Sequence, residues 1–389
     1  MSAATVYQKI RNLLKSHINK GVDESSLDRL CLLVIGIITA KSASPSQIAV
    51  ALAKLGLTAG KAESIERRIR RTENDPEIEP DLCFHALARW RLRFGKPRRL
   101  HLIIDVTTQE EHVAKLTASV WYRGRSLPLA WLVWPANTRL EEFDFWQQVS
   151  RLLDEVELIL PVRIPVIWLA DRAFGCPAFT DLVTAKGWHY VARVQGHTRY
   201  RDCMGRETPL AALVPTIGSR AKGAGQVFKK RGWRTASVVI HWGHRHETPL
   251  CLVSDLAPNW LLLAWYRRRY AIEATFRDYK SHGWHWEQGQ VRDLEHIQKL
   301  LVGMALATWI ALMVGTQVAQ EHLRIKPSGR RRTPPWIAKR SLFTLGLDRL
   351  HTWLFGNGLA EFIWLLTDWE APNWSTQIHA HHVYDFIFG

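Results

Sequence analysis

Two acidic residues stand at the ends of short apolar runs, where a carboxylate is well placed to do chemistry. The first run covers residues 98–105 and ends at Asp105, and the second covers residues 165–171 and ends at Asp171. Each run is typical of a buried strand, and ligands of open α/β sheets bind at the carboxyl ends of strands. Either acid alone is commonly a turn or helix-cap residue. As a pair they predict a pocket that holds two carboxylates.

A third acid lies on a predicted long helix over residues 259–284. This helix carries Tyr266, Arg269, Glu273 and Lys280. At roughly 100° per residue these four side chains fall within an arc of about 60°. One helix face therefore presents a phenol, a guanidinium, a carboxylate and an ammonium group. The alternative is a salt-bridged surface helix, in which Arg269 and Glu273 form an i,i+4 pair.

Three carboxylates at one site favour metal-assisted phosphoryl transfer. Two divalent metal ions about 4 Å apart require several hard oxygen ligands, which Asp and Glu side chains supply. Mg²⁺ suits carboxylates together with phosphate oxygens and needs no His or Cys ligand. The nearby cationic and phenolic groups would hold a nucleic-acid backbone on either side of the reacting phosphate.

These residues resemble a known family. The pattern Tyr-x2-Arg-x3-Glu-x6-Lys at 266–280 is similar to the signature of the IS-four family of bacterial insertion-sequence transposases, which are DDE enzymes. The segments LIIDVTT at 102–108 and WLADRAFG at 168–175 resemble those that carry the family's first and second catalytic Asp. The resemblance extends from about residue 28 to residue 350.

The resemblance implies an RNase H-like catalytic core that is interrupted by a β-rich insertion between the second Asp and the Glu. It implies cut-and-paste transposition: hydrolytic nicking at the transposon end, a hairpin intermediate, and joining of the 3′-ends to target DNA. The implied cofactor is a pair of Mg²⁺ ions, with Mn²⁺ as a substitute. The implied partner is double-stranded DNA, both terminal inverted repeats and target, bound by a homodimer on paired ends.

Site residues are carried over position by position from the resemblance. Asp105, Asp171 and Glu273 are the expected catalytic residues and metal ligands. The expected DNA-binding residues, which would contact phosphates around the cut, are Tyr266, Arg269, Lys280 and, in the matching Asp-Arg motif, Arg172.

The chain divides into three parts by pattern. Residues 1–95 read as helices, and the run Arg67, Arg68, Arg70 and Arg71 is either a DNA-facing surface or a solvated one paired to acids. Residues 96–325 read as a strand, a hairpin over 115–135, an amphipathic helix at 141–156, a strand ending at Asp171, a helix at 177–187 and a strand at 188–194. A β-rich segment at 196–256 and the long helix follow. The fold class is therefore α/β, a mixed sheet flanked by helices. Residues 326–389 read as a basic linker and a helical C-terminal region.

Charge and composition are consistent with a DNA partner. The sequence has 52 Lys+Arg against 36 Asp+Glu, a net charge of +16, which favours a polyanion, either nucleic acid or an anionic membrane surface. Residues 300–319 are long and apolar enough to span a bilayer, but a single such segment is more typical of a buried core helix. We therefore expect no membrane, and the resemblance implies a cytoplasmic bacterial protein at the nucleoid.

Two other functions of the same class of fold remain open from the residues. One is an RNase H-like DNA nuclease without strand transfer. The other is a non-catalytic DNA-binding repressor derived from a transposase. Both would keep the basic surface, and they differ in whether cut DNA ends appear and whether they are joined.

Overall fold

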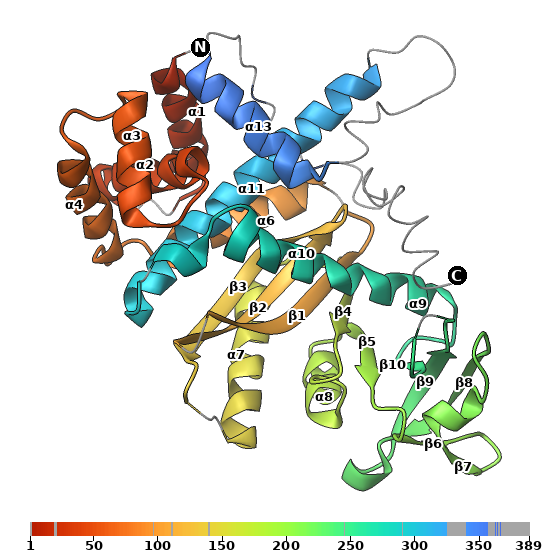
Figure 1. The fold of residues 1–389 in the computed structure, drawn as a ribbon. Helices are drawn as coiled ribbons and strands as arrows, with labels where there is room; N and C mark the ends of the chain where they lie inside the picture. Colours follow the sequence, from red (N-terminus) through yellow and green to blue (C-terminus); the bar gives the residue numbers. More distant parts are fainter. Residues whose placement is uncertain are drawn as a thin grey trace.

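The computed structural model (Figure 1) describes residues 2–356 apart from 19–21, 96, 110–111, 139–140, 245, 290 and 325–339. Beyond residue 356 it describes residues 362, 364 and 366. The predicted basic linker therefore lies outside the described residues, except for its last residue. Most of the predicted C-terminal helical region after residue 356 also lies outside them.

The described residues before residue 96 form six helices with short connections, as predicted. They are α1 (Ala3–Lys15), α2 (Glu24–Ala40), α3 (Pro45–Leu55), α4 (Ala62–Glu73), α5 (Pro80–Cys83) and α6 (His85–Gly95). Local chemistry sets their starts: the side chain of Asp23 accepts a hydrogen bond from the Ser26 amide at the start of α2, and Pro45 occupies the first position of α3. α2 is buried along most of its length and packs against α3 and α4.

One mixed sheet of ten strands forms the centre of the protein (Figure 1). Its order is β3-β2-β1-β4-β5-β10-β9-β8-β6-β7. The strand bounds are β1 Leu100–Gln109, β2 Val113–Tyr122, β3 Arg125–Pro135, β4 Val166–Ala170, β5 His189–Val194, β6 Arg199–Arg201, β7 Glu207–Pro209, β8 Arg220–Val227, β9 Arg234–His241 and β10 Leu250–Ser254. The predicted hairpin over 115–135 is β2 and β3, joined at Arg123 and Gly124, both with positive φ (48° and 84°).

The middle of the sheet is parallel and buried on both faces. β4 pairs in parallel with both β1 and β5, and all five of its residues are buried. Because side chains alternate along a strand, Ile167 and Leu169 pack toward helix α9 (Leu261–Tyr266). Trp168 instead contacts Phe179 of α8 (Pro177–Ala185), on the face that α7 (Glu142–Ile159) also covers.

The segment 196–256 is rich in strands, as its sequence predicted. Its strands do not form a separate body, because β10 pairs with β5 on one side and with β9 on the other. The insertion therefore lengthens the central sheet by five strands. Short 3₁₀ turns lie within it at Leu210–Leu213 and Lys229–Arg231.

The predicted long helix at 259–284 is a continuous helical rod whose hydrogen-bond register changes. It begins as α9, tightens to a 3₁₀ turn at Arg267–Tyr270, continues as α10 (Ala271–Arg277) and widens to a π-helical turn at Asp278–His282. The predicted helix is therefore present, with changes of hydrogen-bond register that the prediction did not include. Contacts to His101, Thr108 and Ser126 join the rod to the sheet.

The apolar segment at 300–319 is a core helix. It forms part of α11 (Leu294–Arg324), which is followed by α13 (Leu342–Phe355) and preceded by a 3₁₀ turn at Trp286–Gly289. By length and composition α11 is the one helix among the described residues that could cross a membrane, yet 94% of its apolar window is buried inside the protein. It packs against α2, α13 and β3.

Small residues let α11 and α13 cross closely. A Cβ added at Gly315 would lie 1.9 Å from the Leu342 carbonyl oxygen, and one added at Gly346 would lie 1.7 Å from the Ala311 oxygen. α13 also contacts α1 and α2, and His351 Nε2 lies 2.7 Å from the Ile38 carbonyl oxygen. One hydrophobic core therefore runs from α1 through α11 to α13.

Candidate active site

The two acids of the apolar runs lie on neighbouring parallel strands. Ile104 of β1 pairs with Ala170 of β4, so Asp105 and Asp171 each follow a residue of that pair. Asp171 comes directly after β4, as predicted. Asp105 lies inside β1, which continues to Gln109, so the prediction that its strand ends at the acid was wrong. Pairing with β2 extends β1 through its more polar residues.

Hydrogen bonds from nearby backbone amides orient both acids. Asp105 Oδ1 accepts a hydrogen bond from the Val106 amide at 2.9 Å. Asp171 Oδ1 accepts one from the Ala173 amide, also at 2.9 Å. The turn role considered for Asp171 is therefore present, and it leaves other carboxylate lone pairs unassigned.

Arg269 joins the third acid to the first. Its Nη1 atom lies 3.3 Å from Asp105 Oδ2, and its Nη2 atom donates a hydrogen bond to Glu273 Oε1. The i,i+4 pair considered from the sequence is thus formed, and the same guanidinium also reaches across to β1. The Arg269 side chain is 9% exposed, whereas that of Glu273 is 51% exposed.

Burial and like charge act on Asp105. Burial raises the pKa of the Asp105 carboxyl to about 6, and Arg269 opposes this rise. The negative charges of Asp171 and Glu273 raise that pKa further. The three acids, on β1, directly after β4 and on α10, are therefore close enough for their charges to interact. A cation bound among them would favour their ionised forms.

The remaining predicted residues take different positions. Tyr266 is 1% exposed, and burial raises the pKa of its phenol to about 12. Lys280 donates a hydrogen bond from Nζ to the Thr108 carbonyl oxygen at 2.6 Å, near the end of β1. Arg172 is exposed and reaches Gln195 at 3.3 Å. Among these cations Arg269 makes the direct contacts to the acids.

The chemistry of the three acids suits hard cations. All their donor atoms are carboxylate oxygens, the ligands that Mg²⁺ prefers. In the described part of the chain, no three His, Cys, Asp or Glu side chains converge as a formed metal cluster. The Arg269 guanidinium lies between two of the three acids. The donor set fits a divalent ion, and Arg269 holds the positive charge in the structure as it stands.

Sequence reasoning missed a second set of residues that fixes the helical rod. Arg268 contacts His101 Nδ1 at 2.7 Å and lies over the Trp121 ring at 4.3 Å. Thr275 Oγ1 accepts a hydrogen bond from the Ser126 amide at 3.0 Å. These contacts join residues more than a hundred positions apart, so no local spacing could have revealed them.

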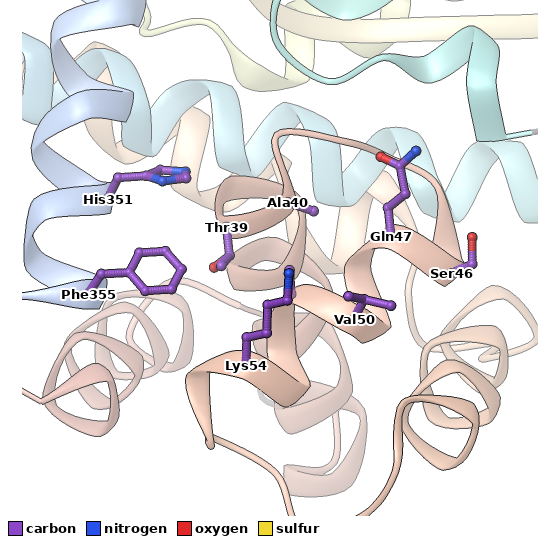
Figure 2. A pocket seen from close by; sticks show the side chains of 9 residues that line it. Thr39, Ala40, Ser46, Gln47, Val50, Lys54, His351 and Phe355 are labelled. Atoms are coloured by element: carbon purple, nitrogen blue, oxygen red, sulfur yellow. The ribbon is translucent and has the colours of Figure 1, made fainter.

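The hollow shown in Figure 2 lies elsewhere. It has a volume of about 540 Å³ and lies between α2, α3 and α13, with Thr39, Val50, Lys54, His351 and Phe355 among its lining residues. None of the predicted site residues lines it. We therefore place the candidate chemistry at the three acids beside β1 and β4, and not in this hollow.

Comparisons with known proteins bear on this site. Acids on adjacent strands and a facing helix define a candidate phosphoryl-transfer site. Residues 142–310 match the family model of the transposase DDE domain. The matched range contains Asp171 and Glu273 and begins after Asp105.

A solved structure, the piggyBac transposase synaptic complex with hairpin DNA, is similar to this chain with a TM-score of 0.47 and 10% sequence identity. The similarity covers 91% of this chain and 80% of that one. No curated protein matches the chain.

Proposed function

We propose that this protein is a DDE transposase that cuts and rejoins DNA at a site formed by Asp105, Asp171 and Glu273. The observation that carries the proposal is the shared environment of the three acids, in which Arg269 bridges Asp105 and Glu273 and the charge of Asp171 acts on Asp105. The match of residues 142–310 to the transposase DDE domain supports it.

In this proposal the three carboxylates hold two divalent ions, Mg²⁺ or Mn²⁺. These ions would activate the attacking water or 3′-hydroxyl and stabilise the leaving oxygen of an in-line phosphoryl transfer. Once metal ions balanced the charge of the acids, the Arg269 guanidinium would release them and contact a DNA phosphate. Lys280 and Arg172 would contact flanking phosphates. Tyr266, which the resemblance implies as a further phosphate contact, is 1% exposed, so in this proposal it would reach a phosphate only if DNA binding exposed its phenol.

The finer parts of the proposal follow the family resemblance. The strands β1 to β5 would form an RNase H-like core, and β6 to β10 an insertion that extends it. The reaction would pass through a nick, a hairpin and strand transfer, on a homodimer that pairs two inverted-repeat ends. The protein would act in the bacterial cytoplasm, at the nucleoid.

The N-terminal helices would supply DNA-binding surface. Arg67, Arg68, Arg70 and Arg71 of α4 are all exposed, and Arg70 forms an ion pair with Glu66 at 2.8 Å. Exposed arginines on one short helix suit the negative phosphate backbone. We propose residues 1–95 as the DNA-binding domain, residues 96–325 as the catalytic domain, and 326–389 as a linker with a helical C-terminal region.

The test is a cleavage assay on the DNA that flanks the gene, with Mg²⁺ and with EDTA. We expect Mg²⁺-dependent nicks at a repeat boundary with the wild-type protein. Glu273→Gln should lose about 100-fold or more in rate, the effect of removing an essential catalytic group. Glu295→Gln, an exposed acid at the start of α11, is the matched control and should cut normally.

The products separate the alternatives. Free ends that never join to target DNA would favour a nuclease without strand transfer. Metal-independent binding of the ends with no cleavage would favour a repressor and overturn the catalytic proposal. Equal cleavage by wild type and Glu273→Gln would remove Glu273 from the site.

A further inference from the structure

The π-helical turn after α10 is fixed at its first residue by a buried ion pair. Asp278 begins this turn, and its Oδ2 atom lies 2.8 Å from Arg125 Nε, at the start of β3. The two side chains are 10% and 19% exposed. Arg125 is itself oriented by a 3.1 Å hydrogen bond from Nη1 to the Gly124 carbonyl oxygen. Such a pair is costly to break from one side, because the remaining charge stays buried.

The backbone of Asp278 closes the turn from the other end. Its carbonyl oxygen accepts a hydrogen bond from the Trp284 amide at 2.8 Å. Trp284 is fully buried and donates from its ring nitrogen to Thr308 at 3.0 Å. A Cβ added at Gly283 would lie 2.6 Å from the same carbonyl oxygen, so the turn requires glycine there. Asp278 therefore anchors both the start and the end of the turn.

The turn separates two residues that the proposed reaction needs. Glu273 lies before it, on α10, which Thr275 ties to the Ser126 backbone. Lys280 lies inside it and reaches the Thr108 carbonyl oxygen at 2.6 Å. A π-helical turn shifts every following side chain relative to an ideal α-helix, and such turns are frequent at functional sites. The position of Lys280 relative to Glu273 thus depends on where the π-helical turn begins.

We propose that Asp278 is a positioning residue, which acts through its ion pair with Arg125 to hold Lys280 where it meets a DNA phosphate. This inference rests on the proposed function, since it takes Lys280 to be a phosphate-binding residue. Asp278 itself touches no substrate. Its carboxylate fixes where the π-helical turn begins, and that starting point determines the position of the Lys280 side chain.

A double-mutant cycle tests this dependence. The readout is the Kd for a labelled duplex of the DNA end that the wild-type protein recognises, measured without divalent metal, below the melting temperature of every variant. We expect Asp278→Asn to weaken binding by about 10-fold in the wild-type background and by less than about 2-fold in Lys280→Ala, because coupled residues are not additive. Arg125→Met should show the same pattern from the other side of the pair.

A matched control separates positioning from loss of stability. Glu79→Gln removes the Lys299 ion pair of 2.6 Å between α11 and the N-terminal helices, and it should change binding by the same factor in both backgrounds. If Asp278→Asn does not fold, Arg125→Lys, which keeps the charge, replaces it in the cycle with a smaller expected effect.

Equal factors for Asp278→Asn in the two backgrounds would overturn the inference. So would unchanged binding in Lys280→Ala, which would show that Lys280 holds no phosphate. A wild-type protein that binds no DNA end would overturn the proposed function itself, and this inference with it.

Discussion

Arg269 and Asp105 face each other across the gap between the helical rod and β1, with 3.3 Å between Nη1 and Oδ2. The same guanidinium is bonded to Glu273. In the free protein a single cation from the chain itself therefore contacts two of the three acids and balances one of their two negative charges. Any metal ion that binds these acids competes with Arg269 for them.

This competition gives a prediction for Arg269→Ala. Without the guanidinium, the partly buried Asp105 loses its counter-charge, so the melting temperature at pH 7.5 in EDTA should fall by about 2 to 4 °C. Mn²⁺ should then raise the melting temperature of Arg269→Ala more than that of the wild type. Arg29→Ala, which breaks the 2.6 Å pair to the buried Asp75, should show the wild-type response to Mn²⁺. Equal Mn²⁺ shifts in all three proteins would contradict the prediction.

Lys115 predicts a pH-dependent stability. It is fully enclosed, with its Nζ atom over the rings of Phe276, Tyr279 and Trp286 at 5.5, 4.7 and 5.3 Å. Burial lowers the pKa of its ammonium group to about 7, and the charge of Lys280 adds to this effect. Above pH 7 the unfolded chain keeps a proton that the folded protein releases, so this group makes stability rise with pH.

Lys115→Met should therefore be more stable than the wild type at pH 7, by on the order of 1 kcal/mol, since an apolar side chain of similar volume replaces a buried charge. The advantage should shrink by pH 9, where Lys115 is neutral in the folded protein. Urea denaturation of both proteins at the two pH values measures it. A variant that is less stable at both would show that the cation–π contacts outweigh the cost of burial.

The contact of α11 with α13 predicts a large effect from one methyl group. Gly315→Ala should destabilise the protein by about 2 kcal/mol or more, because its Cβ would meet the backbone of α13 and the helices would have to separate. Gly289→Ala is the control, since its Cβ would lie 3.5 Å from the nearest atom. Guanidinium denaturation compares them. Similar stability of the two variants would show that the crossing can widen freely.

The exposed arginines of α4 predict a change in salt dependence. If they bind phosphates, replacing Arg67, Arg68 and Arg71 by Ala should weaken DNA binding. The slope of log K against log [salt] should also become shallower by about 0.9 for each phosphate that the variant no longer neutralises. Arg151→Ala on α7, whose side chain is 68% exposed, should leave the slope unchanged. An unaltered slope in the triple variant would show that these arginines face solvent and contact no DNA phosphate.

Local pattern was enough to predict most of the elements that carry the site. The apolar run before Asp171 predicted β4, the segment 115–135 with Gly124 near its turn predicted the hairpin, and the amphipathic stretch at 141–156 predicted α7. These predictions succeeded because short apolar runs, a turn glycine and a helical period are all local features of the sequence. That Asp105, Asp171 and Glu273 are catalytic stays a prediction.

What the sequence could not predict depends on distant contacts. A polar Lys115 on a strand suggests an exposed side chain, but rings from residues 276–286 cover it. The 3₁₀ and π-helical turns of the rod each cover only four or five residues. Segments this short do not change the spacing of apolar residues enough to be recognised in the sequence. Arg125 and Asp278 lie 153 positions apart, and only the folded sheet brings them together.

The packing of α1 and α2 against α11 and α13 has a consequence for how the chain is made. Leu30, Val34 and Ile38 of α2 are fully buried in the finished protein, yet part of the core around α2 is supplied by helices that begin at Leu294 and Leu342. During synthesis the N-terminal helices leave the ribosome long before those partners exist. The apolar surfaces of α1 and α2 therefore cannot be fully covered until α11 and α13 have been synthesised. A nascent chain cut short by premature termination would expose an apolar surface that chaperones and proteases recognise.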